Sequence, residues 1–277
     1  MRVDVDGARL FFDVEGAQLR PEGPWLAEHP TVVIVHTGPG SDHTAYKEHI
    51  GPKLAETCQV IYLDLRGCGL SDRCTPETWN VETWSSDLRA LLARIGVRRP
   101  VVLAAGFGCF VALRYAQRWP DEVSKLVLSN PNARADVGRI LARYRALGGP
   151  KAESSAREFF EHPSEATVAA FLRDCFPVMV PPDYAARLML LPLWNLELAI
   201  HWVATEMRTL DLRPGLAAIL APSLVLAGSD DPQYPAESIA EVAEGLHDAR
   251  VEHFPGARHS VFRDAPESMD LVARFVA

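Results

Sequence analysis

The sequence contains few cysteines, fewer basic than acidic residues, and no long apolar run. Its five cysteines form no C-x-x-C pair, and their odd number favours free thiols over a disulfide framework. The 28 Lys and Arg against 36 Asp and Glu give a net charge of −8, which argues against nucleic acid as a partner. No stretch is long enough to span a bilayer, and the first residues lack the apolar segment of a signal peptide. We therefore expect a cytoplasmic protein without a membrane or nucleic-acid partner.

Apolar residues make up 48% of the 277-residue chain. A chain of this length buries enough surface to fold without a metal or a disulfide. We expect no metal and no cofactor, and a small molecule as the partner. A second copy of the chain, in a homodimer, is the other partner that we consider.

Short apolar runs alternate with amphipathic segments along most of the chain. Apolar and polar residues alternate from Val3 to Val14 on both sides of Asp6-Gly7, and this pattern is typical of a β-hairpin. Runs rich in β-branched residues follow, without alternation, as expected of strands buried on both faces. They cover 31–36, 59–65, 100–105, 124–130 and 221–228. Helical patterns cover 81–96, 109–120, 235–247 and 265–276. This order predicts a mostly parallel sheet with helices on both faces.

One segment interrupts this order. Residues 133–217 contain helical patterns and many aromatic side chains but no convincing strand. We interpret the segment as a helical cap inserted into a core formed by residues 1–132 and 218–277. The alternative is a set of core helices within the main body.

Two glycine-containing loops follow predicted strands, where ligand sites lie in open α/β sheets. In "HTGPG" (residues 36–40), the glycines let the backbone turn so that the N–H of Gly38 points at a developing oxyanion. His36 and Thr37 of the same loop are candidate substrate contacts. The loop "DLRGCGLSD" (residues 64–72) is typical of a hydrogen-bonded turn, and we assign it a structural role.

The stretch "LAAGFGCFVALRYA" (residues 103–116) has the pattern of a nucleophile elbow with Gly106 at its apex. Such an elbow needs small residues two positions before and after the nucleophile, because the strand turns sharply into a helix. Ala104 and Gly108 meet this requirement. The N–H of Phe107 is then the second oxyanion donor.

An acid and a histidine follow in the order that this architecture requires. Asp231 comes just after one predicted strand, in "LAGSDDP", and His259 lies in the next strand–helix connection, in "FPGARHSV". Asp230 is the alternative to Asp231. Their other interpretations are a turn aspartate and a loop histidine without a catalytic role.

Together these motifs make the chain resemble the α/β-hydrolase-fold family, and "HTGPG" is similar to the HGGPG loop of its proline-iminopeptidase-like branch. The resemblance implies a mostly parallel eight-stranded sheet flanked by helices, with a helical cap after strand 6. It implies that Asp231 orients His259 as the base and that Gly38 and Phe107 form the oxyanion hole. Gly106 stands where the nucleophilic serine belongs. Thr37 and Ala105 also depart from the family pattern.

Three hypotheses follow from Gly106. The first is an enzyme that uses the His259–Asp231 dyad on a small apolar ester, amide, lactone or related carbonyl compound. The dyad would activate a water or abstract a proton from the substrate. Proton abstraction includes lyase, cyclase and cofactor-free oxygenase reactions. In the case of water activation, a water of roughly 30 Å³ fills the space of the missing side chain. The second is a serine esterase or aminopeptidase-like hydrolase inactivated by an engineered serine-to-glycine change. The third is a non-catalytic binding protein.

Other residues are weaker candidates. Cys109, three residues after the apex, is expected to be buried in the helix rather than to act as a nucleophile. Helical spacing in the cap also relates Trp194, Glu197, His201 and Trp202. One interpretation is that they line a substrate pocket, in which Glu197 can bind a substrate amine. The other is that they belong to the core of the cap and its solvated edges.

Overall fold

A mostly parallel eight-stranded sheet forms the centre of the computed structural model, which describes residues 1–190 and 193–277. The strand order is β1-β2-β6-β5-β7-β8-β9-β10. The strands are β1 (Arg2–Val5), β2 (Ala8–Glu15), β5 (Thr31–Val35), β6 (Gln59–Leu63), β7 (Val101–Ala105), β8 (Lys125–Ser129), β9 (Ser223–Gly228) and β10 (Ala249–Phe254). From β6 to β10 all neighbours are parallel, whereas β1 and β2 form an antiparallel edge. The predicted sheet is confirmed.

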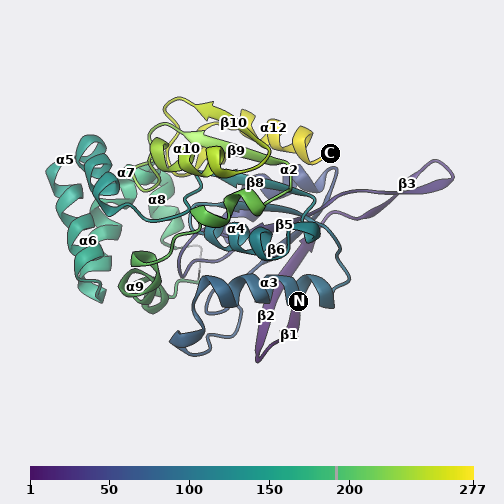
Figure 1. Ribbon diagram of the computed structural model, residues 1–277, viewed down its shortest axis with the longest axis horizontal. Coiled ribbons are helices and arrows are strands. Elements are labelled where there is room, and N and C mark those ends of the chain that lie inside the picture. The colour runs from purple at the N-terminus through teal and green to yellow at the C-terminus, as the bar shows by residue number, and fades with distance from the viewer. Residues whose placement is uncertain (191–192) are drawn as a thin grey trace.

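Helices cover both faces of this sheet (Figure 1). Along β5, Val33 and Val35 join one buried apolar cluster, and Val32 and Ile34 join the other. Helices α3 (Val81–Arg94), α4 (Gly108–Arg118) and α10 (Ala236–Gly245) contribute to the first cluster. Helices α1 (Thr44–Glu48), α2 (Ile50–Ala55), α11 (Val261–Asp264) and α12 (Glu267–Val276) contribute to the second. Burial on both faces explains why the central strands show no polar alternation.

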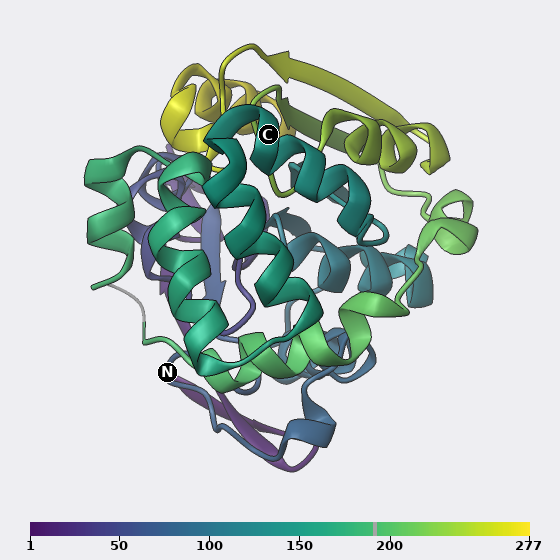
Figure 2. The same ribbon diagram turned by 90° about the vertical axis from the view of Figure 1, so that its left-hand side faces the viewer.

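The segment between β8, the sixth strand of the main sheet, and β9 is helical. It contains α5 (Val137–Glu161), α6 (Glu165–Asp174), α7 (Phe176–Met179), α8 (Pro182–Leu188), α9 (Leu196–Ala204), η3 (Glu206–Arg208) and η4 (Arg213–Ala218). Helices α5 to α9 gather on one side of the molecule and lie in front of the sheet when viewed from that side (Figures 1 and 2). The segment leaves and returns at adjacent points, because Arg134 and Asp211 form an isolated β-bridge.

The sequence did not predict the small hairpin formed by β3 (Leu19–Glu22) and β4 (Trp25–Glu28). It projects away from the body of the molecule (Figure 1). The large side chains of Leu19, Trp25 and Leu26 are exposed, so the hairpin lacks the alternation of a half-buried strand. The remaining short helices are η1 (Pro76–Thr78) and η2 (Pro120–Glu122). Within the described ranges, no helix is long and apolar enough to cross a membrane.

Candidate active site

The structure places Gly106 at the apex of the turn from β7 into α4. Its φ is +52°, in the left-handed region that favours glycine. The turn is fixed by two backbone hydrogen bonds, from the N–H of Gly106 to the carbonyl of Ser129 (3.0 Å) and from the N–H of Cys109 to the carbonyl of Gly106 (3.1 Å). The sequence therefore forms the strand–turn–helix geometry of a nucleophile elbow with glycine at the apex.

A buried carboxylate holds the imidazole that faces this turn. The Nδ1 of His259 lies 2.9 Å from Oδ2 of Asp231. The other oxygen, Oδ1, accepts hydrogen bonds from the N–H groups of Gln233 (2.8 Å) and Tyr234 (3.2 Å). The alternative partner, Asp230, instead accepts a hydrogen bond from the hydroxyl of Ser229. Asp231 is thus the residue that can orient the ring and stabilise its protonated form.

Three further contacts fix the position of His259. Its N–H donates to the carbonyl of Met179, at the end of α7, over 3.1 Å. The side-chain amide of Asn130 donates to the carbonyls of Arg258 and His259. The ring of Tyr234 stacks on the imidazole with 5.3 Å between centroids. Sequence analysis missed Tyr234, although its position three residues after Asp231 is a usable signal, because turn carboxylates often accept such N–H groups.

The imidazole lies directly over Gly106. A β-carbon at position 106 would lie 2.8 Å from Cε1 and 2.9 Å from Nε2 of His259. A carbon–carbon bond adds about 1.5 Å, so the ring is within about 4.3 Å of the glycine α-carbon. This spacing leaves no room for a water molecule between ring and α-carbon, contrary to the sequence-based expectation. An oxygen bound by His259 has to approach from the pocket side.

The two backbone N–H groups predicted to form an oxyanion hole have no acceptor among the described residues. Among the described residues, neither the N–H of Gly38 nor that of Phe107 donates a hydrogen bond to the protein. The ring of Phe107 is buried edge-to-face against Trp84 and Trp202, which fixes its backbone at the start of α4. Both predicted donors are therefore available in the fold.

Two apolar chambers meet at His259. Each chamber has a volume of about 110 Å³. Residues that line both are Gly38, Phe176, Met179, Trp194 and His259. The first chamber also includes Thr37, Ala105, Tyr46, His49 and Tyr184. The second is rich in aromatic rings, which are Phe110, Phe159, Phe160, Phe171, Trp202 and Tyr234. The predicted pocket contacts of Thr37, Trp194 and Trp202 agree with this placement.

The described linings of both chambers contain no Asp, Glu, Lys or Arg. Glu197, expected to bind a substrate amine, is exposed on α9 and belongs to neither lining. His201 packs edge-to-face on Trp79, outside both chambers. These two placements correct the expectation that the whole set of cap residues lines one pocket. Nor do the described residues bring together three or more His, Cys, Asp or Glu side chains that could hold a metal ion.

His36 is a support for the loop rather than a substrate contact, which corrects a second expectation. It is fully buried, and its Nε2 accepts a hydrogen bond from the N–H of Leu65 (3.1 Å). Its Nδ1 donates to the carbonyl of Thr37 (2.6 Å). Both ring nitrogens are thus used by the backbone, which requires the neutral imidazole. Burial lowers the pKa of His36, outweighing the nearby carboxylate of Asp64.

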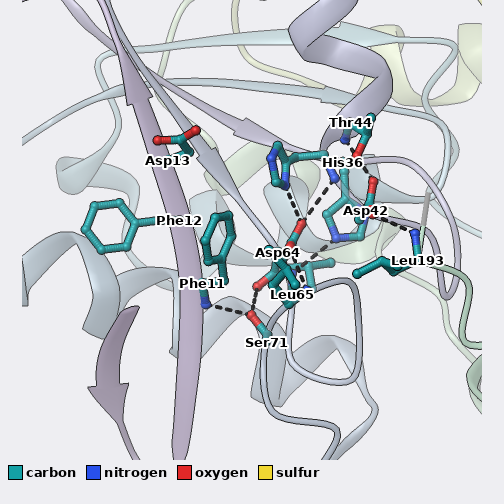
Figure 3. Close-up of polar contacts among 12 residues, drawn as sticks. Phe11, Phe12, Asp13, His36, Asp42, Thr44, Asp64, Leu65, Ser71 and Leu193 are labelled. Carbon is teal, nitrogen blue, oxygen red and sulfur yellow. Dashed lines mark hydrogen bonds and ion pairs between the residues drawn. The ribbon is translucent and has the colours of Figure 1, made fainter. Parts of the chain in front are cut away.

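Buried carboxylates anchor the same loop (Figure 3). Asp64, directly after β6, accepts hydrogen bonds from the N–H of Leu70 and from both the N–H and Nδ1 of His43. Asp42 accepts from the N–H of Thr44 and, with its other oxygen, from the N–H of Leu193 in the segment before α9. Burial alone would raise the pKa of Asp64, but the contacts with His43 lower it overall. The "DLRGCGLSD" loop therefore supports the "HTGPG" loop and the residues after it, through the contact of Leu65 with His36 and the contacts of Asp64 with His43.

We expect stability to fall as the pH drops from about 7 to 5.5, partly because of His36. Its pKa is lowered in the folded state, so below about 6.5 the unfolded chain binds more protons. Stability from the neutral ring is therefore present above that pH and is lost below it. His36→Gln should have a smaller dependence of unfolding free energy on pH, measured by urea denaturation. His253→Gln, at an exposed position, is the control, and equal slopes in His36→Gln and wild type would contradict the assignment.

Comparisons with known proteins agree with this geometry. The family described as alpha/beta hydrolase fold matches residues 30–266. The chain is 27% identical over 283 residues to the proline iminopeptidase PfmaB of Pestalotiopsis fici, covering 95% of this chain and 96% of that protein. It is 26% identical over 247 residues to the AB hydrolase superfamily protein YisY of Bacillus subtilis, covering 88% and 90%.

A solved structure with a similar fold is the enol-lactonase from Burkholderia xenovorans. It has a TM-score of 0.77 at 20% identity and covers 100% of this chain and 99% of that one. At this identity the likeness concerns the fold alone. With the family match over most of the sequence, the chain belongs to the α/β-hydrolase fold family and resembles its proline-iminopeptidase-like branch.

Proposed function

We propose that the protein is an enzyme that acts on a small, neutral, apolar carbonyl compound through His259 and Asp231, without an acyl-enzyme. The observation that carries this proposal is the position of the imidazole. It is held by a buried carboxylate, covers a glycine at the elbow, and lines both apolar chambers. A positioned histidine of this kind is suited to remove and return a proton.

Acyl transfer to residue 106 is not available to this chain. In serine proteases, removing the nucleophile lowers kcat by about 10⁶. Cys109 does not replace it, because its thiol is buried in α4 and burial raises the thiol pKa far above the usual range. The dyad must therefore act directly on the substrate, or on a water bound at the pocket side of the ring.

The chambers favour a neutral substrate. A charged group placed there would lose hydration, because the described linings offer no opposite charge. An aminopeptidase-like reaction needs a partner for the substrate amine, and Glu197 is outside the chambers. The absence of such a partner from the described linings favours an ester, lactone or ketone with apolar substituents over a substrate with a free amine.

The proposal can be tested with three neutral substrates. Two are the aryl esters 4-nitrophenyl acetate and 4-nitrophenyl butyrate, and the third is the lactone dihydrocoumarin. We expect turnover by the wild type without an initial burst, and an unchanged intact mass during turnover. His259→Gln should reduce the rate at least a hundredfold, in line with the usual contribution of a general base. His253→Gln, which changes an exposed histidine on β10, should keep the wild-type rate.

Two results would overturn the proposal. One is a protein mass raised by the acyl group during turnover, which would show a covalent intermediate. The other is a His259→Gln variant that is folded and as active as the wild type, which would remove the dyad from the reaction.

A further inference from the structure

The hydroxyl of Thr37 is buried and, among the described residues, has no hydrogen-bond partner. Its backbone is fixed on both sides, because the N–H donates to the hydroxyl of Tyr46 (3.1 Å) and the carbonyl accepts from Nδ1 of His36 (2.6 Å). A buried hydroxyl without a partner carries a free-energy cost, and most such groups in folded proteins are paired. An unpaired hydroxyl on a fixed backbone in a pocket indicates that its partner is a ligand.

The Thr37 hydroxyl faces the same point as the imidazole. A β-carbon built on Gly106 would lie 3.0 Å from Oγ1 of Thr37 and 2.9 Å from Nε2 of His259. The two groups come from different loops, one after β5 and the other after β10. The first chamber is lined by Thr37, Gly38, Ala105 and His259. A ligand in it lies beside both residues, where Nε2 offers a proton acceptor and Oγ1 a hydroxyl donor.

We propose that Thr37 is a catalytic residue whose hydroxyl binds the oxygen that His259 deprotonates. This proposal rests on the proposed function. It adds that the group deprotonated by His259 is one hydroxyl group. The O–H bond breaks, its proton forms the Nε2–H bond of His259, and the electron pair stays on the oxygen. The Thr37 hydroxyl donates a hydrogen bond to that developing anion, and Asp231 stabilises the imidazolium. The oxygen is that of a water or of a substrate enol or phenol.

The geometry excludes two other roles for Thr37. The hydroxyl does not hold the loop in place, because the backbone N–H and carbonyl of Thr37 make the hydrogen bonds that do so. A cap on a helix is also excluded, because the first helix after the loop is α1, whose first residue is Thr44. The hydroxyl is left for the ligand.

Thr37→Val tests the proposal, because valine keeps the shape of threonine and removes the hydroxyl. Thr37→Ser is the matched variant that restores it. One readout is hydrolysis of 4-nitrophenyl butyrate, in which water supplies the oxygen. The other is the absorbance of bound 4-nitrophenol, which reports whether the phenol is ionised and models a substrate hydroxyl.

For Thr37→Val we expect kcat for the ester to fall roughly tenfold to a hundredfold with KM little changed, since hydrogen bonds to charged groups are of this strength. Alternatively, the pH at which bound 4-nitrophenol ionises should rise by about one unit, for the same reason. Thr37→Ser should behave as wild type in the readout that changes. A change in the first readout identifies water as the source of the oxygen, and a change in the second identifies a substrate hydroxyl.

Wild-type behaviour of Thr37→Val in both readouts would overturn this inference. His259→Gln distinguishes this failure from failure of the proposed function. If His259→Gln loses ester hydrolysis while Thr37→Val keeps it, the dyad stands and the role of Thr37 is wrong. If His259→Gln also behaves as wild type, the dyad itself is wrong.

Discussion

Gly106→Ser is expected to convert a protein that does not react with a fluorophosphonate into one labelled at a single site. We propose that the chain supplies the remaining parts of a serine hydrolase site. Asp231 holds His259 at 2.9 Å, and the N–H groups of Gly38 and Phe107 make no other hydrogen bond within the described residues. The ring has only to withdraw by some tenths of an ångström from a new β-carbon, and a side chain can make that shift. Intact-mass analysis after incubation with the probe measures the result.

Gly106→Ala is the matched control for this experiment. It introduces the same β-carbon, 2.8 Å from the imidazole, and the same strain at φ +52°, but no hydroxyl. Both variants should lose at least about 1–2 kcal/mol of unfolding free energy, the usual cost of a side chain in this backbone region, and the contact with the ring adds to this loss. Both should also lose the wild-type reaction, because the new side chain occupies the point at which Nε2 of His259 and Oγ1 of Thr37 converge. Only the serine variant should be labelled.

Gly96→Ala separates the backbone cost from the contact with the ring. Gly96 has φ +76° at the end of α3, where a left-handed glycine is usual, and no atom lies within 4 Å of a β-carbon built there. A larger loss of stability at position 106 than at position 96 measures the displacement of His259. A folded Gly106→Ser variant that is not labelled would show that imidazole and oxyanion donors do not converge on residue 106.

The elbow and the dyad were predictable because local sterics and chain order determine them. Ala104 and Gly108 are small where a strand turns sharply into a helix, so the frame of the turn can be read without a structure. Asp231 and His259 follow consecutive parallel strands, whose carboxyl ends lie at one edge of the sheet. Their relative order in the chain is therefore enough to bring them together.

The cap residues were harder to predict, because side-chain direction depends on where a helix begins. Trp194, Glu197 and His201 were treated as one helical face. In the structure Asn195 caps α9 through its side chain, which accepts a hydrogen bond from the N–H of Leu198, so Trp194 precedes the helix. Glu197 consequently points to solvent while Trp194 lines both chambers. Whether the side chains of Thr37 and His36 have hydrogen-bond partners likewise depends on tertiary contacts, which no local sequence pattern encodes.

Gly108→Ala should destabilise the protein strongly, by about 3 kcal/mol, at the upper end of the usual cost of overpacking. A β-carbon at Gly108 would lie 2.5 Å from the carbonyl oxygen of Val35 and 2.6 Å from that of His36. Both are backbone atoms at the end of β5, which is paired with β6 and β7. They cannot withdraw without breaking the sheet, so α4 has to move instead.

The movement of α4 links this loss of stability to the site. Gly108 is the first residue of the helix, and a shift there carries Phe107 and Gly106 away from His259. We therefore expect Gly108→Ala to lose the wild-type reaction even where urea denaturation shows it to be folded. Gly138→Ala is the control, since its β-carbon makes only an ordinary 3.5 Å contact near the start of α5, where alanine is favoured over glycine. A Gly108→Ala variant as stable as the wild type would show that the elbow does not pack against β5 in this way. The position of residue 106 relative to the imidazole of His259 would then not depend on this packing.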